Sequence, residues 1–226
     1  NTNLFRTFAI FGVDYETPFR LKNNYKNFLY TPKLSFVVSP GASNSGKISN
    51  EDSSVNSYII ENNILLNRFT GNDKLDNSKR VNAQFNITNA NFDMNLLQTY
   101  EFTNNSNYHY KNGNEKKLSD FLGNFNFRNS IYETNYNFRY NHENDFMKSQ
   151  NVQLKFDNKI GEFKFGYLDQ KSKTDEVITS DNETLNYTIN SKKINKYSNI
   201  SYFGLYDLKN SFNKESGISY KYFDEC

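Results

Sequence analysis

Hydrophobic and polar residues alternate along most of the chain with a period of two. In the stretch IYETNYNFRY, residues 131–140, bulky aromatics occupy one parity, and amides and charges occupy most of the other. Successive side chains of a β-strand point to opposite faces of the sheet, so this stretch predicts a strand with one aromatic and one polar face. Such two-faced alternation favours an antiparallel sheet, because parallel strands are buried on both faces.

The same alternation predicts about twelve strands, each close to the ~9–11 residues that a tilted strand needs to cross a bilayer. They are expected near residues 4–13, 29–38, 55–68, 80–89, 93–103, 117–128, 131–141, 149–157, 160–170, 184–191, 197–208 and 212–223. Asparagine-rich turn signals separate several of these strands, at residues 89–91, 128–130, 157–159 and 209–211. Asn tolerates positive φ and bonds its own backbone, so these signals predict tight hairpins.

The connections from residue 69 onward alternate in length. Long ones are expected at 69–79, 104–116, 142–148 and 171–183, and short ones at 90–92, 129–130, 158–159 and near 192–196. Outer-membrane barrels have short periplasmic turns and longer extracellular loops. The pattern therefore predicts an all-β chain that is part of an antiparallel, up-and-down transmembrane β-barrel. The long connection 39–54 falls on the short-turn side, so we expect this loop to be tucked inside or at the rim.

The two faces of the predicted wall differ in what they can contact. Aromatic side chains suit lipid, and amides and charges suit a wet lumen. We expect lipid contact for Tyr136, Phe138, Leu154, Phe165 and Tyr202, and lumen exposure for Asn137, Arg139, Lys155, Lys164 and Ser201. A soluble β-sandwich, a repetitive adhesin or a solenoid would also alternate. The absence of a fixed repeat period weakens the solenoid, and the aromatic content would make an unusual sandwich core.

Composition agrees with a strand-rich protein. The 226 residues are 36% hydrophobic and 17% aromatic, and the mean hydropathy is −0.85. No run approaches the ~20 apolar residues of a spanning helix, and the aromatic content is too high for a disordered chain. The length suits one large domain. The formal charge of +2 is spread without a basic run, so no nucleic-acid partner is expected.

Residues for catalysis, metal binding or redox chemistry are few. His109 and His142 are far apart in sequence, and Cys226 is the single cysteine. No Ser-His-Asp set, carboxylate pair or phosphate-binding loop occurs in a credible context, so we expect no enzyme activity and no cofactor. The chain begins at Asn1 with neither an initiator Met nor a signal peptide, from which we expect it to be a fragment.

One region departs from the alternation and carries more specific motifs. Residues 39–84 contain SP (Ser39, Pro40), NEDS (Asn50, Glu51, Asp52, Ser53), an NRF.G.D run (Asn67, Arg68, Phe69, Gly71, Asp73) and Arg80 at the start of a strand. QTYEF (98–102) and SDFLG (119–123, with Ser119 and Asp120) follow in order, and YFDEC closes the chain. Together they resemble the LptD (OstA) family of outer-membrane barrels. Family members usually have Tyr-Gly where Ala83 and Gln84 stand, and a Gly where Leu97 stands.

The resemblance implies a function in transport. Family members insert lipopolysaccharide into the outer leaflet of the Gram-negative outer membrane. Their partners, besides lipopolysaccharide and outer-membrane lipid, are a plug lipoprotein, LptE, and a periplasmic LptA bridge reached through an N-terminal jelly-roll domain. By this resemblance residues 1–226 belong to one barrel domain, and the jelly-roll, the early strands and the last strands lie outside the chain. A porin-like channel or importer barrel is the first alternative, and a soluble β-rich adhesin is the second.

Several motif residues also have ordinary structural interpretations. Glu51 and Asp52 suit a solvated acidic loop or a helix cap, and Gly71 with Asp73 suits a turn. Arg68 and Arg80 are expected to pair with Asp73 or Asp76 and so fasten a loop inside a polar lumen. In the family, cysteines near the position of Cys226 pair with the N-terminal domain, so the resemblance implies a disulfide here, with a free buried thiol as the alternative.

Overall fold

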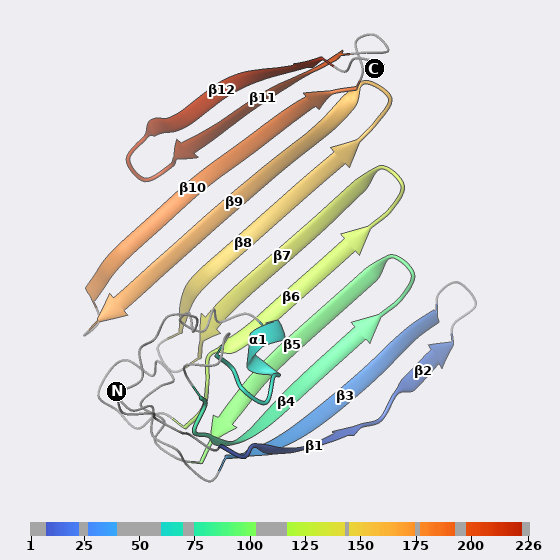
Figure 1. The fold of residues 1–226 in the computed structure, drawn as a ribbon, viewed down its shortest axis with the longest axis vertical. Coiled ribbons are helices and arrows are strands. Elements are labelled where there is room, and N and C mark those ends of the chain that lie inside the picture. Colours follow the sequence, from blue (N-terminus) through green and yellow to red (C-terminus); the bar gives the residue numbers. More distant parts are fainter. Residues whose placement is uncertain are drawn as a thin grey trace, which may run out of the picture. The chain divides into compact units, whose positions relative to one another are not determined.

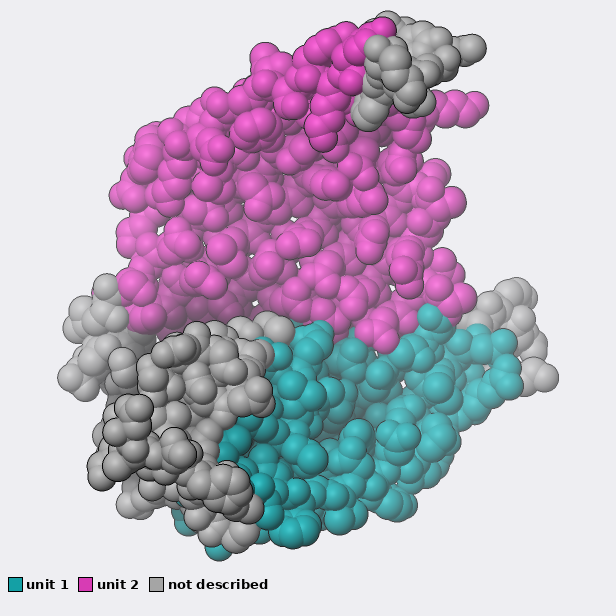
Figure 2. Space-filling view, in the orientation of Figure 1, with its two compact units in different colours: residues 1–89, 94–123 teal, residues 90–93, 124–226 magenta. Residues whose placement is uncertain are grey.

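The structure is a computed structural model that describes residues 8–22, 27–39, 60–69, 75–102, 117–142, 145–174, 177–192 and 198–222. The described strands follow an antiparallel, up-and-down order, β1-β3-β4-β5-β6-β7-β8-β9-β10-β11-β12, with β2 also pairing with β3 (Figure 1). The chain divides into two compact units (Figure 2). Unit 1 comprises residues 1–89 and 94–123, and unit 2 comprises residues 90–93 and 124–226.

Unit 1 contains the N-terminal strands and one short helix. Its elements are β1 (Phe11–Glu16), β2 (Phe19–Lys22), β3 (Asn27–Val38), α1 (Ile60–Asn63), β4 (Lys79–Thr88), most of β5 (Phe92–Glu101) and the start of β6 (Phe121–Arg128). Strands β1 and β2 both run along β3 and are separated by Thr17 and Pro18. Proline has no N–H to donate to a ladder, which accounts for the interruption at this point.

Unit 2 is a series of hairpins. After β6 come β7 (Tyr132–Asn141), β8 (Phe146–Asp157), β9 (Gly161–Thr174), β10 (Val177–Ser191), β11 (Ser198–Asp207) and β12 (Phe212–Tyr222). The predicted turns are confirmed, and asparagine closes two of them. Asn129 Oδ1 accepts hydrogen bonds from the backbone N–H groups of Ile131 and Tyr132, at 2.8 Å each. Asn158 Oδ1 does the same for Ile160 and Gly161, at 2.8 and 3.0 Å.

The strand predicted at 55–68 is wrong in its described part. Residues 60–69 form the helix α1 and turns, and β3 pairs directly with β4 through Val37 and Arg80. Ile60 and Ile64 are spaced four apart, so they share one side of a helical turn, and the same spacing also fits one face of a strand. The long connection 39–54, expected inside or at the rim, lies outside the described residues apart from Ser39. No helix in the described ranges is long and apolar enough to span a membrane.

The loop predicted at 171–183 is also wrong. Strand β9 continues to Thr174, and β10 begins at Val177. Here both faces become polar: Asp169 lies opposite Glu183, and Lys171 opposite Asp181, on the face that carries Phe165 further along. The hydrophobic alternation therefore ends although the backbone ladder continues. The strand predicted at 4–13 overlaps β1 only at residues 11–13, and residues 1–7 lie outside the described part.

Strand register confirms the grouping of side chains into two faces in unit 2. Directly opposed residues of antiparallel strands share a face. Leu154 lies opposite Phe165, and Tyr202 lies opposite Ile189, whereas Lys155 lies opposite Lys164. One face accordingly carries Tyr136, Phe138, Leu154, Phe165 and Tyr202, and the other carries Asn137, Arg139, Lys155, Lys164 and Ser201.

Burial is inverted relative to an ordinary globular protein. Among the described residues, the buried set contains five hydrophobic and seventeen polar or charged side chains. Large apolar side chains are exposed instead, for example Val13 at 67% in unit 1 and Ile218 at 75% in unit 2. Rings on the aromatic face pack mainly against one another, as with Tyr30 and Phe85, whose centroids are 4.4 Å apart. The aromatic face therefore has no partner layer within the described chain.

Candidate functional site

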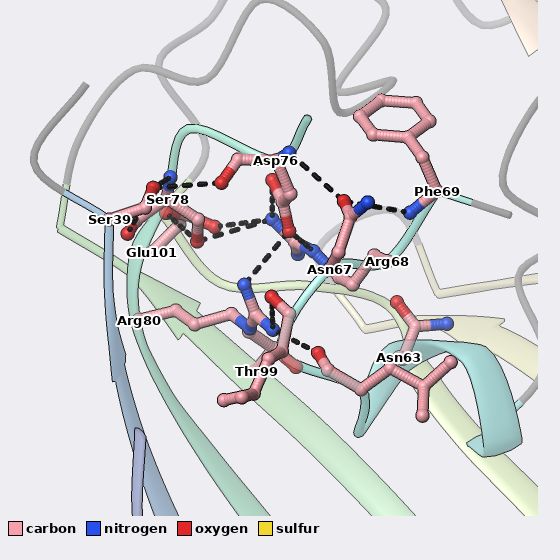
Figure 3. A network of polar contacts seen from close by, with 12 residues as sticks. Ser39, Asn63, Asn67, Arg68, Phe69, Asp76, Ser78, Arg80, Thr99 and Glu101 are labelled. Carbon is pink, nitrogen blue, oxygen red and sulfur yellow. Dashed lines mark hydrogen bonds and ion pairs between the residues drawn. The ribbon is translucent and has the colours of Figure 1, made fainter. Parts of the chain in front are cut away.

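Four buried charges lie together in unit 1, where the connection from β3 enters β4 and where β5 ends (Figure 3). They are Arg68, Asp76, Arg80 and Glu101, each only 1% exposed. We call this group the charge cluster. It contains two cations and two anions, so its formal charges balance. A balanced set is the arrangement in which buried charges are tolerated, because an unpaired buried ion costs several kcal/mol, on the order of 3–5 when one partner is removed.

Asp76 binds both arginines. Arg68 donates from Nε to Asp76 Oδ2 at 2.5 Å and from Nη2 to Oδ1 at 3.0 Å, which is a bidentate pair. Arg80 donates from Nη1 to Asp76 Oδ2 at 2.8 Å. These are the two arginines that were expected to fasten a loop, and Asp76 is one of the two partners proposed for them. Asp73, the other proposed partner, lies outside the described residues.

Glu101 extends the cluster from the connection to the end of β5. Its Oε2 accepts a hydrogen bond from Arg68 Nη2 at 3.0 Å. Its Oε1 accepts one from the Ser78 hydroxyl at 2.6 Å and one from the Lys79 backbone N–H at 3.0 Å. Both carboxylate oxygens are therefore used within the protein, and Glu101 ties the start of β4 to the segment that carries Arg68.

Side-chain hydrogen bonds to the backbone, made by two neutral residues and by Arg80, fix the chain around the charge cluster. Ser39 Oγ donates to the Asp76 carbonyl at 2.8 Å and accepts from the Ser78 N–H at 2.7 Å, so the residue after β3 is joined to the residues before β4. Asn67 Oδ1 accepts from the Asp76 N–H at 3.0 Å. Arg80 Nη2 donates to the Leu65 carbonyl at 2.5 Å. Each of these bonds spans at least nine positions of sequence, and together they hold residues 65–69 and 75–78 in place.

The helix α1 holds the same connection from its apolar side. Ile60 packs with Leu97 of β5 and Leu122 of β6, and Ile64 packs against this group. Figure 1 shows α1 lying over one face of the sheet, at β5 and β6. The face is the polar one, because Leu97 has the same parity as Thr99, whose hydroxyl donates to Asn82 Oδ1 at 2.9 Å. Leu97 thus occupies a polar-face position and provides the contact for the helix.

Other motif residues have structural partners or lie outside the described part. Ser119 Oγ accepts from the Thr99 N–H at 2.9 Å and donates to the Asp120 carbonyl at 2.8 Å, which joins β5 to the residues before β6. The remaining motif residues, Asn50, Glu51, Asp52, Ser53, Gly71, Asp73 and Cys226, lie outside the described residues. Their expected roles, including the disulfide of Cys226, stay predictions.

Sequence reasoning missed two members of this network. Glu101 stood inside the QTYEF motif without a role, and Ser78 was not considered. The available signal was parity: Glu101 follows Leu97 and Thr99 at intervals of two, at the end of a strand whose neighbour starts with Arg80. A buried, charge-balanced group of this kind fastens chain segments together.

Comparison with known proteins identifies the family. The model of the family LptD, described as LPS transport system D, matches residues 1–213, which include the whole charge cluster and end before Cys226. No curated protein matches the chain. The match covers nearly the full length, and the antiparallel up-and-down strand order agrees with it. The chain therefore belongs to the LptD family of lipopolysaccharide transport proteins.

Proposed function

We propose that this chain forms wall strands of a Gram-negative outer-membrane β-barrel that transports lipopolysaccharide and inserts it into the outer leaflet. The proposal rests on the family match over residues 1–213. One structural observation supports the membrane setting: the aromatic face is exposed while the polar side chains are the buried ones. A lipid-facing barrel wall requires that inversion, because hydrocarbon tails replace the partner layer that a soluble core would need.

The charge cluster is proposed to hold the connection between β3 and β4 against the polar face. In a barrel that face lines the lumen, so residues 60–69 would narrow the passage at one end of β4 and β5. A polar lumen can solvate the rim of such a loop while the four charges neutralise one another. We infer a supporting role in transport for Arg68, Asp76, Arg80 and Glu101, with no catalytic step assigned to them.

The proposed partners follow from the family. They are lipopolysaccharide, outer-membrane lipid, an LptE-like lipoprotein inside the lumen and an LptA-like periplasmic bridge that would be reached through an N-terminal domain. The exposed aromatic face weighs against the soluble adhesin, which would bury Phe and Tyr between two sheets. A passive channel shares the same wall, so only a transport measurement separates it from the proposed function.

The test uses the full-length protein in its own bacterium, with the native gene under a repressible promoter. Depletion should reduce newly made lipopolysaccharide at the cell surface, measured by antibody labelling of intact cells after a pulse of labelled sugar. Re-expression of the full-length protein should restore it. Uptake of a small neutral solute is the comparison for a passive channel. If depletion slows solute uptake and leaves surface lipopolysaccharide unchanged, the result would contradict the transport function and support a passive channel.

A further inference from the structure

Two tight turns at one end of the unit 2 strands are built alike, and each exposes an isoleucine. They join β6 to β7 and β8 to β9, and Figure 1 shows both at the same end of these strands. In each turn asparagine is the first residue and isoleucine the third, as Asn129 with Ile131 and as Asn158 with Ile160. Ile131 is 57% exposed, and Ile160, at 79%, is the most exposed large apolar side chain among the described residues.

The backbone polar groups of the first turn are paired within the protein. Asn129 Oδ1 accepts from the N–H groups of Ile131 and Tyr132, and the Asn129 N–H donates to the Tyr132 carbonyl at 2.9 Å. The Ile131 carbonyl accepts from the Asp157 N–H of the next hairpin at 2.7 Å. A turn in water can leave such groups to the solvent, whereas a turn in contact with lipid must pair them internally.

The second turn repeats this arrangement. Asn158 Oδ1 accepts from the N–H groups of Ile160 and Gly161, and the Asn158 N–H donates to the Gly161 carbonyl at 3.1 Å. The Ile160 carbonyl accepts from the Lys192 N–H at 2.9 Å. In both turns the asparagine closes the backbone, so the isoleucine has no part in turn formation beyond its own N–H and carbonyl. Its exposed side chain therefore requires a separate explanation.

The aromatic face of unit 2 continues to these turns without a polar interval. Tyr132 directly follows Ile131. It lies opposite Phe156, which in turn lies opposite Phe163. The rings of Tyr132 and Phe127 are stacked, with centroids 5.4 Å apart. Aromatic residues of this kind line the two interfaces of an outer-membrane barrel wall, so the turn residues are the next part of the chain to meet the membrane surface.

The opposite ends of the unit 2 strands differ in both respects. The turn between β11 and β12 carries Lys209 and Asn210, both exposed and polar. On β9 and β10 the aromatic face becomes charged before the strands end, where Asp169 lies opposite Glu183. The apolar part of this face is thus offset toward the isoleucine turns. That offset places the isoleucine turns at the membrane boundary and the opposite ends of β9 and β10 beyond it.

We propose that Ile131 and Ile160 insert into the phospholipid leaflet on their side of the membrane and hold this part of the wall at the membrane boundary. The inference rests on the proposed function, which supplies the membrane and assigns short turns to the periplasmic side, opposite the lipopolysaccharide leaflet. An apolar side chain gains free energy in proportion to the area that it removes from water. Arg128 and Lys159, which are exposed beside the isoleucines, can bind lipid phosphates while their apolar stems lie along the acyl chains.

A periplasmic protein is the alternative occupant of the two isoleucines. Stable protein interfaces bury about 800 Å² on each partner, and two isoleucine side chains supply a small part of that area. Lipid requires no minimum area and already accounts for the aromatic face that leads into the turns. The continuity of Ile131 with Tyr132 on that face therefore favours lipid, and the two experiments below separate lipid from protein.

The first test measures lipid contact in full-length protein reconstituted into phospholipid nanodiscs. A fluorescent amino acid is introduced at Ile131, Ile160, Phe165 or Asn210, and the acyl chains carry bromine, which quenches fluorescence on contact. Quenching at the two isoleucines should be several-fold greater than at Asn210, the exposed turn residue at the opposite end, and should approach that at Phe165 on the aromatic face. Quenching at the isoleucines no greater than at Asn210 would overturn the proposal. Absence of quenching at Phe165 would instead overturn the lipid-facing wall itself.

The second test places a photo-crosslinking amino acid at Ile160 or at Asn210 of the full-length protein in growing cells. Radiolabelled glycerol marks the phospholipids of these cells and leaves lipopolysaccharide unlabelled. The adduct at Ile160 should carry the label, and the product at Asn210 should not. Equal labelling at both positions, or an Ile160 adduct that holds a protein or lipopolysaccharide and no label, would overturn the proposal. Unchanged surface lipopolysaccharide after depletion, with the label present at Ile160, would overturn the transport function and leave the lipid contact in place.

Discussion

Glu101 Oε2, at the end of β5, accepts a hydrogen bond at 3.0 Å from Arg68 Nη2, which precedes it by 33 positions on the connection between β3 and β4. Both side chains are 1% exposed. The contact closes the connection onto a strand that is not adjacent to it in sequence. Because Asp76 lies between Arg68 and Arg80, a change at any one of the four charges leaves a buried partner uncompensated.

Asp76→Asn should strongly destabilise the folded protein. The substitution preserves size but removes the charge shared by both arginines, which leaves two buried cations against Glu101 alone. We expect the free energy of unfolding to fall by about 3–5 kcal/mol, measured by urea unfolding of the full-length protein in detergent. Asp14→Asn is the control, because the Lys33–Asp14 pair is 24% and 55% exposed and should cost at most about 1 kcal/mol. Similar losses for both variants would show that burial does not determine how much the ion pairs of the charge cluster contribute to stability.

Arg68 and Glu101 should behave as a coupled pair. Arg68→Met and Glu101→Gln each remove one partner of a buried contact, whereas the double variant removes both charges together. The double variant should therefore lose less stability than the sum of the single variants, by about 1–3 kcal/mol. Urea unfolding of the parent, the two single variants and the double variant completes the cycle. Additive losses would mean that the two residues stabilise the protein independently.

Sequence reasoning captured the features that depend on local chemistry. The alternation around Tyr136 identified strands and their faces, and asparagine turns such as Asn129 and Asn158 marked the hairpins. Sequence reasoning failed where a strand continues beyond its apolar residues. The end of β9 and the start of β10 are polar on both faces and resemble a loop in the sequence. The residue types alone carry no sign that such a backbone is still paired.

The charge cluster could be predicted only in part for a different reason. The sequence indicated that Arg68 and Arg80 hold a loop in place by ion pairs. It offered two carboxylates as their partners, those of Asp73 and Asp76. The choice of Asp76 and the addition of Glu101 depend on β3 pairing directly with β4, and the sequence pattern had placed an extra strand between them. An extra strand predicted between β3 and β4 changes which residues are neighbours at the ends of these strands. For that reason the site required the strand order as well as the motifs.

Leu154 and Lys155 test which face of unit 2 meets lipid. Leu154 shares its face with Phe165, and Lys155 shares the opposite face with Lys164. An Arg on the lipid face of a barrel costs roughly 2–4 kcal/mol at the bilayer midplane. Leu154→Arg should therefore lower the amount of folded barrel in outer-membrane fractions, measured by its migration on unheated gels, and Lys155→Arg should leave it unchanged. Equal tolerance of both substitutions would reject the assignment of the two faces.

Asn158 and Asn210 test which ends of the strands face the periplasm. Asn158 lies in the turn between β8 and β9, and Asn210 lies in the turn between β11 and β12, at the opposite end of the unit 2 strands. The end that carries Asn210 is also the end at which β7 leads into β8, where the long loop 142–148 was predicted, so it should be extracellular. Single cysteines at the two positions in the full-length protein should differ in labelling by a membrane-impermeant thiol reagent on intact cells. Asn210→Cys should be labelled, and Asn158→Cys should be labelled only after the outer membrane is permeabilised. The opposite pattern would invert the proposed orientation of the unit 2 strands in the membrane.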